Sequence, residues 1–116
     1  MSSRVLVPYD RSDEAGYALE HAMEAFDGEI VLLHVVEPFA DHTGAAGFEE
    51  STYEKQLELA NDTLEGVREW FDERERDRIS TVVRYGRPVH EILGYIDDER
   101  IDEVVIGSTG RDGANR

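Results

Sequence analysis

The 116-residue sequence contains no cysteine and only one lysine, Lys55. Without cysteine, a disulfide framework, thiol catalysis and a cysteine-ligated metal are excluded. The Gly-x-x-x-x-Gly-Lys-Ser/Thr signature of a P-loop is also absent, so dedicated ATP hydrolysis is not expected. No apolar run approaches the roughly 20 residues needed to span a bilayer, and the first residues lack the apolar segment of a signal peptide. We therefore expect a cytoplasmic protein that does not bind membranes.

Bases are scarce as well: 27 acidic residues face 12 basic ones, and the net charge is −15. Such a charge repels polyphosphate backbones, which argues against nucleic acid as a partner. A salt-rich cytoplasm tolerates an acidic, lysine-poor surface, because salt screens the self-repulsion. We interpret the charge as an adaptation to environment and expect a halophilic source. The 40% hydrophobic content is that of a globular chain, so the acidity does not indicate disorder.

Four short apolar runs rich in β-branched residues have the pattern of strands, and the first of them has that of a strand buried on both faces. They cover residues 4–8, 30–36, 79–85 and 104–106. Helical spacing of apolar residues separates them, from Asp13 to Phe26, from Tyr53 to Phe71 and from Pro88 onward. In the last of these helices we expect a buried face made of Val89, Ile92, Leu93 and Ile96.

Strands that alternate with helices predict an α/β fold with a parallel sheet, right-handed crossovers and helices on both faces. In such three-layer sandwiches, ligands bind outside the carboxyl ends of the strands, where the strand order reverses. Asp10 follows the first strand, Val35 and Val36 end the second, and Gly107 follows the fourth. We expect these residues to lie around one crevice.

A glycine loop follows the fourth strand, with Gly107-x-x-Gly110 and then Gly113. Glycines let main-chain N–H groups approach a phosphate closely. Ser108 and Thr109 add hydroxyl donors, and Arg111 adds a cation. A turn rich in small residues is the simpler interpretation, and a two-glycine match alone does not decide between them.

Four segments together resemble the universal stress protein family over the whole chain. They are Val-Pro-Tyr-Asp-Arg-Ser-Asp-Glu from residue 7, Leu33-His34-Val35, Gly86-Arg87-Pro88 and the closing Val-Ile-Gly-Ser-Thr-Gly-Arg-Asp-Gly. The resemblance implies a Rossmann-like, flavodoxin-type sheet of order 3-2-1-4-5 that often dimerises through the fifth strand. It also implies binding of ATP or AMP in many members.

The resemblance also assigns roles to particular residues. Asp10, following Pro8, would lie near the adenosine, and the main chain of Val35 would contact the edge of the adenine. Phosphates would bind at Gly107 and Gly110, with Ser108, Thr109, Arg111 and Gly113 beside them. The second half of the family's phosphate pattern would begin at position 120, whereas this sequence stops at Arg116.

We therefore expect a single domain over residues 1–116 that is incomplete at its C-terminus, with a sheet of order 3-2-1-4 and the fifth strand missing. An exposed edge strand and the apolar surface beside it tend to be covered by another chain. This predicts a homodimer or a higher oligomer. Because the net charge of −15 repels ATP, binding would need main-chain amides, Arg111, Arg116 or a bridging Mg²⁺.

Individual side chains leave simpler interpretations open. Asp10 is suited to capping the first helix as well as to contacting a ligand, and the two roles are compatible. We expect His34 to be a hydrogen-bonded core histidine. The four histidines show no metal-ligand spacing, so no metal site is predicted. No serine or threonine has a histidine at a diagnostic spacing, so we predict no catalytic residues.

Three functions remain in competition. The first is a nucleotide-binding stress or regulatory protein without fast turnover, and the second is a dimeric interaction module of the same family that binds no nucleotide. The third is an enzyme of a related nucleotide-handling class, such as an adenylyl-transferring ligase, because one fold hosts many chemistries. That enzyme would need a catalytic lysine or a longer phosphate signature, and neither is present.

Overall fold

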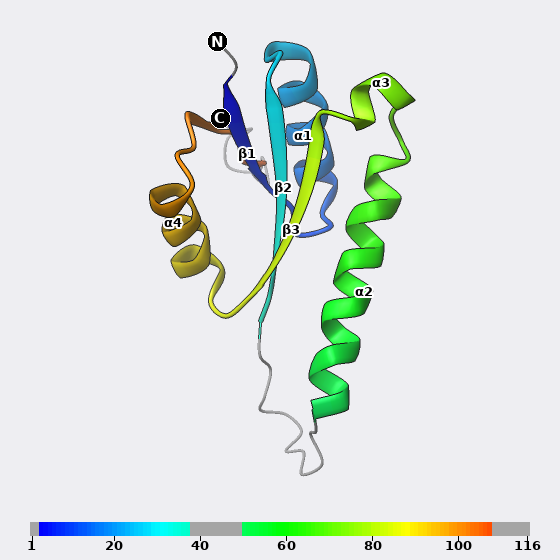
Figure 1. Ribbon diagram of the computed structural model, residues 1–116, viewed down its shortest axis with the longest axis vertical. Helices are drawn as coiled ribbons and strands as arrows, with labels where there is room; N and C mark the ends of the chain where they lie inside the picture. Colours follow the sequence, from blue (N-terminus) through cyan, green and yellow to red (C-terminus); the bar gives the residue numbers. More distant parts are fainter. Residues whose placement is uncertain (1–2, 38–49, 108–116) are drawn as a thin grey trace, which may run out of the picture.

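The computed structural model describes residues 3–37 and 50–107 of the chain. Its four strands are β1 (Arg4–Pro8), β2 (Glu29–Val36), β3 (Ile79–Tyr85) and β4 (Glu103–Val104). All neighbouring pairs are parallel, and the order is β3-β2-β1-β4. Figure 1 shows β1, β2 and β3 side by side. The predicted α/β fold and the order 3-2-1-4 are confirmed.

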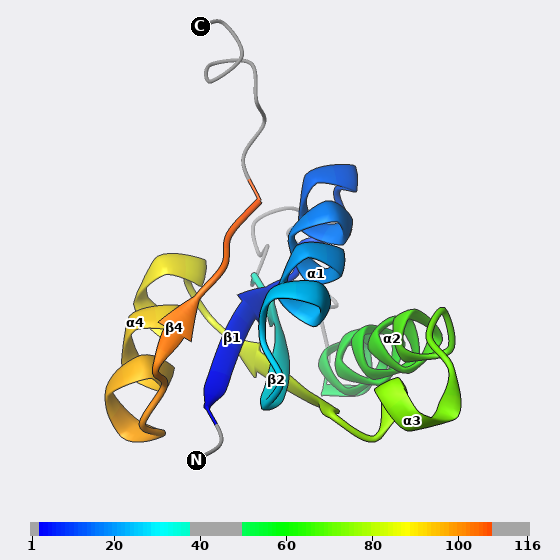
Figure 2. The same ribbon diagram turned by 90° about the horizontal axis from the view of Figure 1, so that it is seen from above.

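The helices are α1 (Asp13–Ala25), α2 (Glu50–Arg68), α3 (Glu73–Arg76) and α4 (Pro88–Asp98). Helices α1 and α2 lie on one side of the sheet and α4 lies on the other, as Figure 2 shows. The sheet is therefore the middle of three layers, as expected for right-handed crossovers between parallel strands. None of these helices is long and apolar enough to cross a membrane.

Two predicted elements differ from the observed ones by more than one residue. The long helix ends at Arg68 rather than at Phe71, and the short helix α3 that follows was not expected. Asp72 caps α3 by accepting a hydrogen bond of 2.9 Å from the Glu75 N–H. The fourth strand is shorter than predicted, although the Val105 N–H still donates to the Leu6 carbonyl at 3.0 Å.

The buried core is divided by the sheet. Val5, Val7, Ile30 and Leu32 pack beneath α1 and α2, whereas the alternate residues of β1 and β2 face α4; they are Leu6, Val31 and Leu33. These side chains are at most 1% exposed. The sheet is thus buried on both faces where β1 and β2 run side by side.

The predicted buried face of α4 was partly wrong. Val89 and Leu93 are 69% and 59% exposed, whereas Tyr95 is only 7% exposed. Tyr95 packs with Leu6, Val31 and Leu33, and Ile92 and Ile96 flank it. The flank of α4 that carries Val89 and Leu93 is therefore turned away from the strands that make the core.

Arg78 joins the end of α1 to the start of β3. No basic residue occupies the last turn of α1, where terminal carbonyls lack helical partners. The Arg78 guanidinium donates to the carbonyls of Gly28 at 3.1 Å and Met23 at 3.4 Å, and also to that of Phe26. A cation at a helix C-terminus is favourable, so this side chain fixes α1 on the sheet.

Candidate functional site

Pro8 ends the pairing between β1 and β4. Even-numbered residues of β1 direct their main-chain N–H and C=O toward β4, since the Leu6 carbonyl accepts a hydrogen bond from the Val105 N–H. The next step of this parallel ladder would need an N–H at position 8, which proline lacks. The two strands therefore separate at their carboxyl ends. Strands β2 and β3 lie on one side of β1, and β4 lies on its other side. The carboxyl end of β1 is therefore the switch point of the sheet.

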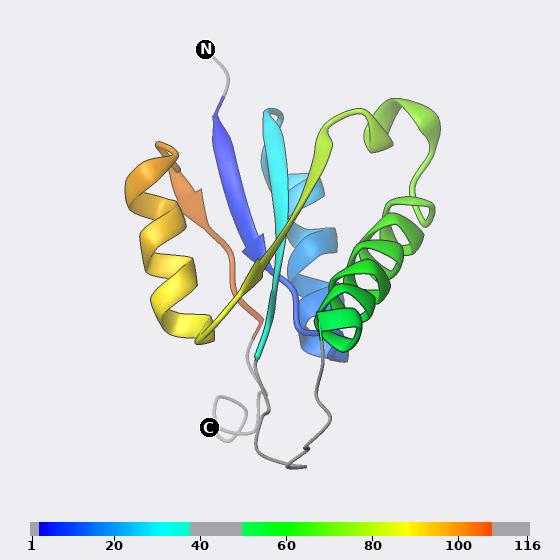
Figure 3. The same cartoon turned by 60° about the horizontal axis from the view of Figure 1, so that its bottom comes forward.

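A cavity of about 300 Å³ lies at this place. Figure 3 shows β1 and β2 running toward the same edge of the sheet. Residues at and after the carboxyl ends of these two strands line the cavity. Its wall contains four residues that the sequence placed here, namely Pro8, Asp10, Val35 and Gly107. The remaining predicted contacts lie outside the described residues; they are Ser108, Thr109, Gly110, Arg111 and Gly113.

The main chain of Val35 faces the space beyond the end of β1. Along β2, odd-numbered residues direct their N–H and C=O toward β1, since the Leu33 carbonyl accepts from the Tyr9 N–H at 2.7 Å. Even-numbered residues of β2 direct these main-chain groups toward β3, since the Val36 carbonyl accepts from the Gly86 N–H at 2.9 Å. The last residue of β1 pairs with Leu33. Val35 therefore turns one donor and one acceptor toward the cavity.

Apolar side chains line much of the cavity, and the sequence analysis had not identified them as site residues. They are Pro88, Val89 and Ile92 from α4 and its first turn, and Ile106 after β4. Ile106 is 63% exposed and Val89 is 69% exposed. Exposed apolar residues directly after a strand at the switch point would have been the signal. Such walls suit a flat aromatic ring.

Asp10 does not cap α1 directly. Ser12 is the N-cap, and its Oγ accepts from the Ala15 N–H at 3.1 Å. The Asp10 Oδ1 accepts from the Ser12 N–H at 3.0 Å and so holds the turn before the helix. Hydrogen bonding to the Ser12 side chain and main chain lowers the pKa of Asp10, against the opposing effect of desolvation. Asp10 is therefore a charged acceptor on the cavity wall.

Gly107 is required by packing, whatever the cavity binds. A methyl group at this position would overlap the Glu14 carbonyl and approach the Ala15 nitrogen to 2.8 Å. The segment after β4 thus lies directly against the first turn of α1. This contact brings Gly107 close to the positive end of the α1 dipole, where anions are favoured.

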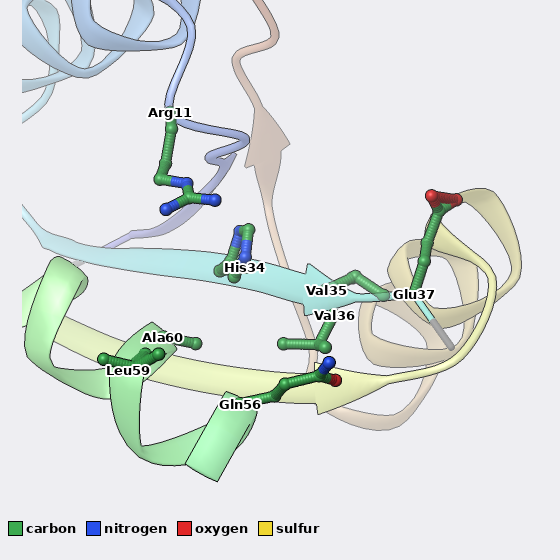
Figure 4. A pocket seen from close by; sticks show the side chains of 8 residues that line it. All are labelled: Arg11, His34, Val35, Val36, Glu37, Gln56, Leu59 and Ala60. Atoms are coloured by element: carbon green, nitrogen blue, oxygen red, sulfur yellow. The ribbon is translucent and has the colours of Figure 1, made fainter. Parts of the chain in front are cut away.

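His34 is hydrogen-bonded, as predicted, but it lies on a cavity wall and is only half-buried, so it is not a core residue. Its Nδ1 is 2.7 Å from the Tyr9 carbonyl. Because a carbonyl only accepts, Nδ1 carries the proton, and a neutral ring has Nε2 as its acceptor. His34 also borders a second cavity of about 340 Å³, which Arg11, Gln56 and Leu59 line (Figure 4).

Within residues 3–37 and 50–107, no three histidine, aspartate or glutamate side chains gather as metal ligands. The fold and the cavity together define a doubly wound α/β domain with a mainly apolar cavity at its switch point.

Comparison with known proteins identifies the family. The model of the universal stress protein family matches residues 1–116. The universal stress protein MJ0577 of Methanocaldococcus jannaschii is 28% identical over 96% of this chain and 79% of its own. A universal stress protein of Thermus aquaticus is 32% identical over 95% of this chain and 80% of its own. The chain belongs to the universal stress protein family.

Solved structures agree with this assignment. The structure of MJ0577 aligns with a TM-score of 0.75 at 26% identity, covering 97% of this chain and 78% of that one. UspA from Lactobacillus plantarum aligns with a TM-score of 0.72 at 25% identity, over 94% of this chain and 81% of that one. The predicted resemblance is therefore confirmed at the level of family and fold.

Proposed function

We propose that this universal stress protein binds an adenine nucleotide, ATP or AMP, in the cavity at the switch point. The observation that carries the proposal is the main chain of Val35, which turns a donor and an acceptor toward an apolar cavity. The edge of adenine presents the complementary pair, the acceptor N1 and the amino group at C6. The apolar side chains of Val89, Ile92 and Ile106 would pack on the ring faces.

The polar end of the ligand would lie toward α1 and Gly107. The charged carboxylate of Asp10 is suited to accept hydrogen bonds from ribose hydroxyls. The N-terminus of α1 would favour the phosphates. We propose that Ser108, Thr109, Gly110, Arg111 and Gly113 complete the phosphate contacts, with Mg²⁺ as a bridging ion. This follows from the family resemblance and the composition of that segment.

Binding without fast turnover is the proposed mode of action, in a stress-response or regulatory role. The only lysine, Lys55, lies on α2 and not in the cavity wall. The charged or titratable side chains among the described lining residues are Tyr9, Asp10 and His34. This set supports recognition of a ligand, and the described part of the wall contains no lysine or arginine.

Isothermal titration with Mg–ATP and with AMP, in high salt to screen the charge of −15, tests the proposal. Val89→Glu places a charge in the cavity and should abolish binding. The matched control is His90→Glu, which alters the adjacent exposed position outside the cavity wall and should bind normally. At about 100 times its Kd, the nucleotide should stabilise the fold by about 2.7 kcal/mol. Absence of heat and of stabilisation at millimolar nucleotide would overturn the proposal.

A second candidate function, a dimeric interaction module, is favoured by the apolar side chains that α4 and the segment after β4 expose. Leu93 and Ile106 are 59% and 63% exposed, and β4 has only two residues. A second copy is the expected partner for this surface. Light scattering after size exclusion should give the mass of a dimer. Leu93→Glu should lower the measured mass toward that of a monomer. A dimer that never responds to nucleotide would favour this function over the first.

A further inference from the structure

A third cavity lies on the α1 side of the molecule, between the first turns of α1 and the turn that joins α2 to α3. Its volume is about 360 Å³. Three aromatic residues line it, namely Tyr9, Tyr17 and Trp70, and two carboxylates, Asp13 and Glu20, stand at its border. Tyr9 borders this cavity and the proposed nucleotide cavity, but Asp10, Val35 and Gly107 line only the latter of the two. The third cavity is therefore a different site from the proposed nucleotide cavity.

The indole of Trp70 is held over α1 by the fold. Trp70 follows α2, and the next residue, Phe71, packs against the core. This anchor directs Trp70 outward across α1, where a methyl group at Gly16 would lie 3.8 Å from its Cζ3 atom. Position 16 is a glycine, so the indole reaches the helix surface without obstruction by a side chain. Trp70 nevertheless remains 58% exposed.

Helix α1 presents the other side of the cavity. Asp13, Tyr17 and Glu20 recur at intervals of four and three residues, so they share one face of the helix. Tyr17 is 67% exposed, with one carboxylate on the turn before it and another on the turn after it. Tyr9, only 6% exposed, is the most buried aromatic residue in the lining. The cavity thus combines aromatic surfaces with negative charge.

Arg11 is the one cation in this lining, against two carboxylates. Figure 4 shows its side chain directed toward His34, at the neighbouring cavity that both residues line. The whole chain carries a net charge of −15, which raises the local concentration of cations. The N-terminus of α1 is close by, but Asp13 and Glu20 outnumber Arg11, so the side chains of the lining and the overall charge favour a cation.

We propose that this cavity binds a methylated ammonium cation, such as a trimethylammonium group. Faces of tryptophan and tyrosine attract cations through the ring quadrupole, and weakly hydrated quaternary ammonium groups are the ligands that aromatic cages recognise. The methyl groups would contact Trp70 and Tyr17, and the positive charge would lie close to Glu20 and Asp13. A neutral apolar ligand would gain the ring contacts but not the charge interaction.

Trp70 provides the assay because it is the only tryptophan in the chain. Choline chloride is titrated into the protein while sodium chloride is reduced to keep the ionic strength constant. We expect a saturable change in tryptophan emission with a Kd on the order of millimolar. The neutral isostere 3,3-dimethyl-1-butanol, which has carbon in place of the charged nitrogen, should bind at least about tenfold more weakly. Equal responses would assign the cavity to apolar groups in general and overturn the proposal.

Matched variants locate the site. Glu20→Gln should raise the Kd for choline about threefold, whereas Glu24→Gln, one turn further along α1 and outside the lining, should leave it unchanged. Tyr17→Leu should abolish the response and Tyr17→Phe should retain it, because the ring and not the hydroxyl is needed. Circular dichroism checks that each variant is folded. If Tyr17→Leu binds choline normally, or no saturable change occurs up to about 100 mM, the proposal fails, whatever the nucleotide titration shows.

Discussion

Replacing Gly107 by alanine should destabilise the protein through a single contact. The added methyl group would meet the carbonyl of Glu14 and the nitrogen of Ala15, which are main-chain atoms of α1. Such atoms cannot move aside as the end of a flexible side chain can, so the segment after β4 must separate from the helix. The backbone conformation is not a cause, because among the described glycines only Gly86 has a positive φ, +148°.

Overpacking of this kind costs about 1–3 kcal/mol. For a domain of this size, each kcal/mol corresponds to roughly 4 °C in Tm, so Gly107→Ala should lower Tm by about 4–12 °C. Urea denaturation measures the free energy of unfolding. An unchanged slope of this free energy with urea concentration would show that unfolding exposes the same amount of surface in both proteins. The assay needs no ligand, so it tests the packing separately from the proposed function.

Gly94→Ala is the matched control for this substitution. Gly94 lies inside α4, and a methyl group there would meet nothing within 4 Å. Alanine is the better helix former, so this variant should gain about 0.5–1 kcal/mol. The same substitution at the two positions should therefore change the free energy of unfolding in opposite directions. A Gly107→Ala variant as stable as the wild type would refute the close approach between residue 107 and α1.

The remaining predictions concern the two ends of α1. Arg78→Gln removes the cation from three carbonyls around the helix C-terminus and should cost about 2 kcal/mol in urea denaturation; no loss would show that water satisfies them equally well. Because the pKa of folded Asp10 is lowered, its contribution to stability is present above the unfolded pKa of about 3.9 and is lost as the pH falls through the lower folded pKa. The stability difference between the wild type and Asp10→Ala should therefore shrink between pH 5 and about pH 2, and a difference independent of pH would contradict the assigned hydrogen bonds.

The first three strands were predictable because runs of apolar and β-branched residues between turn residues leave a clear record in the sequence. Ile79–Tyr85 was predicted to the residue, since it is a β-branched run that ends at Gly86. The end of α2 was not predictable in this way. Phe71 is packed against the core and continues the helical spacing, although the chain has already left the helix in the turn where the Phe71 N–H donates to the Arg68 carbonyl. Spacing records which side chains are buried, not the backbone conformation that buries them.

The error in α4 has a related cause. Val89 and Leu93 fit the apolar stripe of a helix as well as Ile92 and Ile96 do, and the sequence does not show which part of the stripe meets the sheet. Tyr95 decides this, because its large side chain fills the space above β1 and β2. The flank with Val89 is then left beside the cavity, where an exposed apolar residue can serve a ligand.

The chemistry at the switch point depends on the register of the sheet, which the residues of the cavity wall do not determine by themselves. N–H and C=O groups alternate sides along a strand, so a shift of one residue between β1 and β2 would turn the main chain of Val36, not that of Val35, toward the cavity. The register is fixed by burial, because Leu6 and Val31 must face α4 while Val5 and Ile30 face α1 and α2. The core therefore determines which main-chain groups the cavity offers. A substitution that altered this register would remove the proposed adenine contact without changing any residue in the cavity wall.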